Sequence, residues 1–367
     1  AEQTEKYFAR LEGKRVGILT NHTGTIDGVS IVDSLHAAGV DLRIVFAPEH
    51  GFRGSADAGE RVNDSRDEKT GIRIVSLYGP HKQPADSLMR QLDVVLFDMQ
   101  DVGLRYYTYL SSLHYLMTAC ARNGVPLIVL DRPNPNGFYV DGPVLEEKHR
   151  SFVGMHPIPV VHGMTLGELA QMINGEGWLG DGLYCPLTVV PCLHYTHRTR
   201  YRLPVRPSPN LPDMRSVYLY PSLCFFEGTP LSIGRGTKYP FQVIGHPGLK
   251  ETGVLNRPLF TFTPRSVEGA KHPPLEGVQC YGTDLRTFPR NPRIWEKGVD
   301  LSYVVDCYGK LKGREDFFSP FFDKLTGADY VREMIEAGRS ADEIKAVWQE
   351  DVARFREQRR PYLLYRE

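Results

Sequence analysis

The chain has 367 residues, of which 41% are hydrophobic and 24% charged, a composition typical of a globular protein long enough for two domains. Lysine plus arginine number 44, as do aspartate plus glutamate, so the net charge gives no reason to expect nucleic acid or an anionic membrane as partner. No apolar run approaches the roughly 20 residues that a membrane-spanning helix needs.

The first 150 residues alternate short apolar segments with amphipathic ones. Short, continuously apolar strands that alternate with helices indicate a parallel sheet covered on both faces. The sequence therefore predicts a Rossmann-like α/β domain over residues 1–150. Its predicted strands are residues 16–20, 42–47, 72–77, 94–98 and 127–131, with helical periods between most of them.

Polar and ionisable residues follow four of the predicted strands. Pro48 lacks an N–H group and ends the second strand, and Glu49 and His50 come directly after it. Ligands of such sheets bind beyond the carboxyl ends of the strands, so these residues are expected to meet at one edge. The other strands end in Asn21-His22-Thr23, in Asp98-Met99-Gln100-Asp101 and in Asp131-Arg132-Pro133-Asn134.

Nucleotide binding is the usual alternative for this fold, but its motifs are missing. The first strand is not followed by G-x-G-x-x-G, and the sequence contains no Walker A motif. One literal match begins at Gly175, but it follows a predicted helix (165–174) and is typical of a helix end and a turn. His194 and His197 have metal-like spacing without an acidic or cysteine partner nearby, which argues against a zinc site. We expect neither a cofactor nor a metal.

The pattern changes in the second part of the chain, where long stretches rich in proline, glycine and aromatic residues replace the regular alternation. We predict an α+β companion domain over residues 151–367, with long loops and C-terminal helices. Long ordered loops in a compact domain are usually functional. Capping boxes, Thr165 with Glu168 and Ser340 with Glu343, predict the starts of two helices.

Four carboxylates are candidates for catalysis. Glu49 lies between an apolar strand and a glycine, and partial desolvation there would raise its pKa toward the value that a general acid needs; a surface charge explains it equally well. For at least one of Asp98 and Asp101, an Asp–Arg pair that fixes the loop is the better explanation. Glu227 is the best acid of the second domain. Two carboxylates on facing domains would fit hydrolysis of a glycosidic bond.

Long motifs are spread over most of the chain. They include Pro48-Glu49-His50-Gly51-Phe52-Arg53-Gly54, Phe97-Asp98-Met99-Gln100-Asp101-Val102-Gly103, Leu130-Asp131-Arg132-Pro133-Asn134-Pro135, Pro207-Ser208-Pro209-Asn210, and Glu227-Gly228-Thr229 through Gly234-Arg235-Gly236-Thr237. With these motifs the sequence resembles the bacterial exo-β-N-acetylmuramidases of the NamZ type.

The resemblance implies release of terminal N-acetylmuramic acid from the non-reducing end of peptidoglycan fragments. It also implies a Rossmann-like domain with a smaller companion domain, and an active site in the cleft between them. In that family the glutamate of the Pro-Glu-His-Gly motif is the favoured catalytic residue, and Glu49 occupies that position.

N-acetylmuramic acid carries a lactyl carboxylate that ordinary hexosamines lack. Discriminating it calls for a cation, preferably a guanidinium that binds bidentately, such as Arg53, Arg105, Arg132 or Arg235, with Lys238 behind them. Tyr106, Tyr107 and Tyr109 could stack on the sugar or pack in the core. The predicted catalytic residues are Glu49, Asp98 and Glu227, and the predicted substrate-binding residues are His50, Arg53, Gln100, Asp101, Arg105, Tyr107, Arg132, Asn134, Asn210, Arg235 and Thr237.

Two other functions remain open at this point. A non-catalytic protein could use the same cleft to bind cell-wall fragments, and the scattered histidines would suit a metal-dependent deacetylase or isomerase.

The six cysteines lack C-x-x-C spacing, so we expect free buried thiols. The chain opens at Ala1 without a methionine, as an exported protein trimmed at its cleavage site would, and as a recombinant product would. We expect a periplasmic or extracellular protein.

Overall fold

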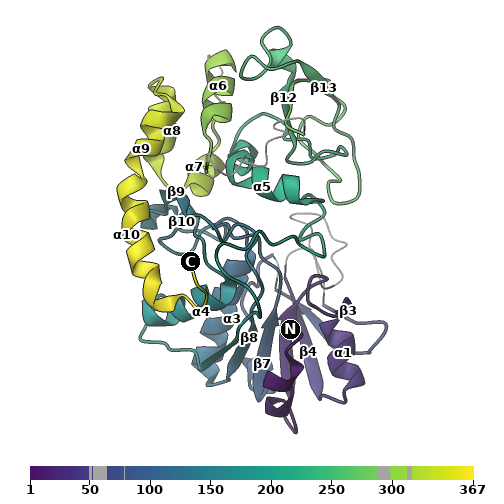
Figure 1. Ribbon diagram of the computed structural model, residues 1–367. Helices are drawn as coiled ribbons and strands as arrows, with labels where there is room; N and C mark the ends of the chain where they lie inside the picture. The colour runs from purple at the N-terminus through teal and green to yellow at the C-terminus, as the bar shows by residue number, and fades with distance from the viewer. Residues whose placement is uncertain (49–51, 53–63, 78, 287–297, 312–315) are drawn as a thin grey trace.

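The computed structural model describes residues 1–48, 52, 64–77, 79–286, 298–311 and 316–367. Figure 1 shows a sheet-containing first domain below and a second domain above it, with the C-terminal helices running down one side back toward the first domain. The predicted α/β architecture is confirmed: a large, mostly parallel sheet is followed by a smaller domain.

The large sheet has seven strands in the order β11-β8-β7-β1-β4-β6-β5. Taken along the chain, its six parallel strands follow the Rossmann order 3-2-1-4-5-6, which places the topological switch point between β1 and β7. The parallel strands are β1 (Val16–Thr20), β4 (Leu42–Ala47), β6 (Arg73–Ser76), β7 (Val94–Asp98), β8 (Leu127–Leu130) and β11 (Leu187–Val190), and β5 (Ser65–Arg66) is antiparallel at the edge.

The central strands of the sheet are mostly apolar because helices cover both of its faces. Leu19 and Phe97 point into one hydrophobic cluster with α3 (Tyr109–Asn123) and α4 (Leu166–Gly175). Ile18 and Leu96 point into the other cluster with α1 (Ile31–Ala37). The short helix α2 (Asp86–Met89) precedes β7, and the hairpin of β2 (Thr25–Ile26) and β3 (Val29–Ser30) follows β1.

The sheet extends past residue 150, where the sequence suggested a boundary. Strand β11 pairs with β8 and completes the edge of the sheet. Between them lie the antiparallel pair β9 (Asp141–Val144) and β10 (Pro159–Val161) and then α4, whose capping box of Thr165 and Glu168 forms as predicted.

The second domain contains an antiparallel sheet of three short strands and six helices among the described residues, joined by long loops. The strands are β12 (Val243–His246), β14 (Cys280–Asp284) and β13 (Phe260–Phe262), in that order. The helices are α5 (Met214–Leu223), α6 (Ser302–Leu311), α7 (Pro320–Thr326), α8 (Asp329–Glu336), α9 (Ala341–Val347) and α10 (Gln349–Arg359).

The C-terminal helices bind back onto the first domain. The capping box of Ser340 and Glu343 starts α9 as predicted. Beyond it, Trp348 Nε1 donates a hydrogen bond to Asp141 Oδ1 at 2.7 Å, and Lys345 Nζ lies 2.8 Å from Asp141 Oδ2. The last residues reach α4, where the backbone N–H of Leu364 donates to the buried Glu168 carboxylate. These contacts fix the two domains against each other.

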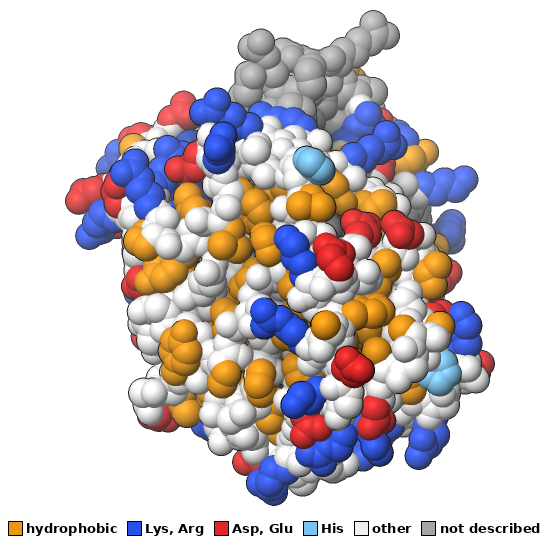
Figure 2. All heavy atoms as spheres, turned by 60° about the horizontal axis from the view of Figure 1, so that its bottom comes forward, with side chains coloured by type: hydrophobic (Ala, Val, Ile, Leu, Met, Phe, Trp, Pro, Cys, Tyr) orange, Lys and Arg blue, Asp and Glu red, His pale blue; other side chains and the backbone are white. Residues whose placement is uncertain are grey.

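The surface charges and the cysteines of the structure agree with what the composition indicated. On the face shown in Figure 2, basic and acidic side chains are interspersed and neither sign dominates. No helix in the described ranges is long and apolar enough to cross a membrane. All six cysteines are free thiols, as predicted, and all but the partly exposed Cys192 are buried.

Candidate active site

A pocket of about 310 Å³ lies between the two domains. From the first domain it is lined by residues 106–109, which follow β7, and by Phe152 and Val153. From the chain beyond the large sheet it is lined by Ser208, Asn210, Tyr220, Glu227, Arg235 and Phe321. Four of the predicted site residues therefore meet in one place: Tyr107, Asn210, Glu227 and Arg235.

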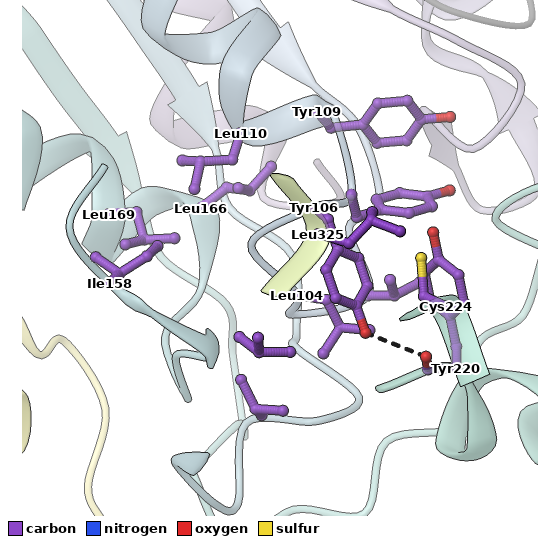
Figure 3. Close-up of a cluster of buried hydrophobic side chains, with 14 of the residues drawn as sticks. Leu104, Tyr106, Tyr109, Leu110, Ile158, Leu166, Leu169, Tyr220, Cys224 and Leu325 are labelled. Atoms are coloured by element: carbon purple, nitrogen blue, oxygen red, sulfur yellow. Dashed lines mark hydrogen bonds between the residues drawn. The ribbon is translucent and has the colours of Figure 1, made fainter. Parts of the chain in front are cut away.

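The tyrosines form a rigid wall because their hydroxyl groups are tied to backbone carbonyls. Tyr106 Oη lies 2.9 Å from the carbonyl oxygen of Pro221 and 3.1 Å from that of Tyr220, and it donates to them. The ring of Tyr106 packs edge-on against the ring of Tyr220 (Figure 3). Tyr107 Oη donates to the carbonyl of Pro207 at 2.8 Å. Each bond joins the loop after β7 to the second part of the chain, so the wall also bridges the domains.

Glu227 and Arg235 form a charge pair on the wall of this pocket. Arg235 Nε donates to Glu227 Oε1 at 2.6 Å, and one terminal nitrogen contacts the same oxygen. The side chains of Arg235 and Glu227 are 18% and 22% exposed, and both line the pocket. Because a guanidinium has five N–H donors and Glu227 accepts from two nitrogens, Arg235 keeps donors for a ligand.

Asp98 and Arg132 occupy the switch point of the sheet and bind each other. Arg132 donates from Nε to Asp98 Oδ1 at 2.6 Å and from Nη2 to Asp98 Oδ2 at 3.0 Å, and also to the carbonyl of Thr25. Asp98 is fully buried and lines none of the larger pockets. This bidentate pair holds the Asp98 carboxylate at the switch point of the sheet and favours a structural role for Asp98, while Arg132 also lines a separate hollow of about 600 Å³.

Gln100 and Asp101 lie in the buried loop that follows β7. Gln100 donates from Nε2 to the carbonyl of Pro133, which ties that loop to the one after β8. Asp101 Oδ1 accepts from the backbone N–H of Gly103 at 2.6 Å, whereas its Oδ2 has no partner among the described residues. Burial raises the pKa of the Asp101 carboxyl to about 7, against the opposing effect of backbone N–H groups.

The raised pKa of Asp101 predicts a pH dependence of stability. The folded protein holds a proton at pH 5–7 that an unfolded aspartate with a pKa near 3.9 has released, so stability falls as pH rises through this range. From pH 5 to 8 we expect Asp101→Asn to gain about 2–3 kcal/mol in free energy of unfolding relative to the wild type. Urea unfolding of both proteins across this range measures it; a constant difference would show that Asp101 does not titrate there.

Three other predicted binding residues are engaged by the protein itself. Arg105 donates to four backbone carbonyls and is 1% exposed. Asn134 donates from Nδ2 to the carbonyl of Met164 and accepts from the backbone N–H of Asn136. Thr237 donates to the carbonyl of Gly234 within a turn. These bonds position loops, and none of the three residues lines the pocket.

Comparison with known proteins identifies the chain. Residues 16–215 match the family described as exo-beta-N-acetylmuramidase NamZ, N-terminal, and residues 218–365 match the corresponding C-terminal family. The chain belongs to the NamZ family. The peptidoglycan beta-N-acetylmuramidase NamZ of Bacillus subtilis (strain 168) is 39% identical to it over 375 residues, covering 98% of this chain and 89% of that protein.

Two solved structures of NamZ-like proteins share the whole fold. A DUF1343 family protein from Bacteroides fragilis NCTC 9343 is 51% identical, with a TM-score of 0.91 over 100% of this chain and 98% of that one. A second DUF1343 family protein of the same strain is 30% identical, with a TM-score of 0.82 over 99% and 97% of the two chains. Both domains and their relative placement are therefore features of the family.

Sequence reasoning left parts of the site unexamined. Glu49, His50 and Arg53, predicted from the strand-end motif, lie outside the described residues. Phe152 and Phe321 line the pocket but were not predicted, because neither belongs to a motif with a chemical signature. Ser208 was missed as a site residue although it stands in a proline-rich motif next to Asn210, which was the available signal.

Proposed function

We propose that this NamZ-family chain is an exo-acting glycosidase that releases terminal N-acetylmuramic acid from the non-reducing end of peptidoglycan-derived saccharides. The observation that carries the proposal is the pocket between the domains, which combines aromatic walls with a charge pair, in a chain related over nearly its full length to a peptidoglycan muramidase. Aromatic surface and a few convergent polar groups are what a small-ligand site requires.

The pocket size supports exo action. Its volume of about 310 Å³ is at the lower end of the roughly 300–1,000 Å³ found for small-molecule sites. A pocket of this size holds one saccharide unit and cannot enclose the middle of a glycan. A chain end therefore enters, and the next sugar stays outside.

The reaction breaks the bond between the anomeric carbon of muramic acid and the oxygen of the next sugar. Glu49 is the proposed general acid: it gives a proton to the leaving oxygen, and a water molecule supplies the hydroxyl group that ends on the anomeric carbon. Among the described carboxylates, Glu227 is the second candidate because it lines the pocket, whereas Asp98 is saturated by Arg132.

The experiment that tests the function is incubation with the disaccharide of N-acetylmuramic acid linked to N-acetylglucosamine. Release of free N-acetylmuramic acid, unchanged by a chelator, supports the glycosidase. Tight binding without cleavage would favour the fragment-binding protein, and chelator-sensitive loss of acetyl groups would favour the metal-dependent deacetylase. Chain-internal cuts in longer glycans would contradict exo action.

Export and a part in cell-wall recycling belong to the same proposal. The supporting argument is the substrate, since peptidoglycan lies outside the cytoplasmic membrane. Immunodetection of the native protein in separated cell fractions tests it, and detection only in the cytoplasm would overturn it.

Arg235 is proposed to bind the lactyl carboxylate that distinguishes muramic acid. We expect Arg235→Ala to lower the ratio of kcat/KM on muramic acid glycosides to that on N-acetylglucosamine glycosides about ten- to hundredfold, because a hydrogen bond to a charged group is worth roughly 1.5–3 kcal/mol. Arg235→Lys keeps the positive charge but lacks the planar guanidinium, so its kcat/KM ratio is expected to lie between those of the wild type and Arg235→Ala. An equal loss on both substrates would show that Arg235 contacts a group that the two sugars share.

A further inference from the structure

The aromatic lining of the pocket divides into a buried part and an exposed part. Tyr106 and Tyr107 are 3% and 8% exposed, and their hydroxyl groups are fixed on carbonyls. Phe321 also lines the pocket, but it is 36% exposed. A residue that both lines a pocket and faces solvent stands at its opening.

Phe321 contributes less to anchoring its helix than its neighbours do. It is the second residue of α7, and the apolar residues that anchor this helix are its neighbours Phe322 and Leu325, which are 0% and 1% exposed. Within the described part of the chain, no ring contact joins Phe321 to another aromatic side chain, whereas Phe322 contacts both Phe318 and Phe225. Its distinction from other exposed hydrophobic residues is that it lines the pocket, where its ring is available to a bound ligand.

Phe152 faces the same pocket from the first domain. It is half-buried, and its ring lies nearly parallel to that of Tyr115, with 6.3 Å between centroids and 23° between planes. The same phenylalanine also lines an adjoining open hollow of about 390 Å³, together with Tyr115 and Arg150. Phe152 therefore borders both the pocket and this hollow.

We propose that Phe321 and Phe152 form the platform on which the leaving-group sugar lies, the saccharide unit next to the terminal muramic acid. The inference rests on the proposed function, because only a glycosidase with a one-sugar pocket leaves its second sugar at the opening. A pyranose presents C–H groups on its faces, and a phenylalanine ring from each domain gives it apolar contact without binding any hydroxyl group. Longer glycans continue toward the hollow beside Phe152.

Substrates that differ only in the leaving group test the platform. The disaccharide with N-acetylglucosamine reaches it, whereas the β-glycosyl fluoride of N-acetylmuramic acid ends inside the pocket. We expect Phe321→Ala to reduce kcat/KM on the disaccharide about ten- to hundredfold, the loss that follows from removing one buried aromatic contact, and to leave the fluoride unchanged. Phe152→Ala is expected to act in the same direction, and Phe321→Trp to retain activity on the disaccharide.

Leu259→Ala is the matched control, because Leu259 is 50% exposed and lines neither the pocket nor the hollow. It is expected to behave as wild type on both substrates. An equal loss on disaccharide and fluoride for Phe321→Ala would overturn the proposal, since Phe321 would then shape the site of the terminal sugar. Full activity on both would overturn it too. Failure of the wild type to cleave either substrate would instead reject the glycosidase function itself.

Discussion

Replacing Glu49 by glutamine is expected to reduce kcat on the muramyl disaccharide by about 10²–10⁴-fold, with a much smaller change in KM. Glutamine keeps the size and hydrogen-bonding groups of the side chain but cannot deliver a proton to the leaving oxygen, and general acids typically contribute that much to rate. Steady-state kinetics on the purified variant measures the effect.

Comparing two substrates with different leaving groups tests whether Glu49 acts as the general acid. A fluoride leaves without full protonation, so Glu49→Gln should keep far more of its activity on the muramyl fluoride than on the disaccharide. Glu68→Gln serves as control, because Glu68 is an exposed carboxylate in the same part of the chain. Wild-type turnover of the disaccharide by Glu49→Gln would remove Glu49 from the role of general acid.

Replacing Arg105 by methionine is expected to lower the free energy of unfolding by roughly 3–5 kcal/mol. The guanidinium donates to the carbonyls of Pro143 and Ile158 in the first domain and of Leu325 and Thr326 at the end of α7, at 2.7–2.9 Å. Methionine fills much of the volume but removes the guanidinium from four buried carbonyls, of which that of Ile158 keeps a bond from the N–H of Leu145. Each carbonyl left unpaired costs about 1–3 kcal/mol before the structure relaxes.

Denaturant unfolding measures this loss, with Arg339→Met as the control. Arg339 is 59% exposed and forms a surface pair with Glu343, so its removal should cost less than about 1 kcal/mol. Both variants lose a positive charge, but only Arg105→Met also loses buried hydrogen bonds to backbone carbonyls. Comparing them therefore isolates the effect of those hydrogen bonds on stability. A change below 1 kcal/mol for Arg105→Met would mean that water replaces the guanidinium.

Arg105 also shows why site prediction from the sequence reached only part of the site. In the sequence it stands two residues before Tyr107 in a motif full of polar groups, and a free guanidinium there would suit a carboxylate ligand. Its acceptors at Leu325 and Thr326 lie 220 and 221 residues away. The close approach also needs Gly327, where a Cβ atom would come within 2.6 Å of Arg105 Nη2.

The pairs Asp98–Arg132 and Glu227–Arg235 also show that the sequence does not reveal which charged residues face a ligand. Each residue was predicted to act on the substrate, and in the structure each carboxylate binds an arginine. Asp98 is fully buried, and its partner Arg132 lines a separate hollow of about 600 Å³, whereas both Glu227 and Arg235 line the pocket between the domains. Sequence spacing does not distinguish the two cases, because the difference lies in what packs over each pair.

The sequence by itself determined five of the six parallel strands of the large sheet, the α/β class, the capping boxes of α4 and α9, and the family. These follow from local properties: the period of apolar residues, the residue that ends a helix or strand, and long contiguous motifs. Only the tertiary structure decided which polar groups face a ligand. The pocket joins residue 106 to residue 321 through the packing of two domains, and burial and hydrogen bonding over such separations depend on contacts that no local pattern encodes.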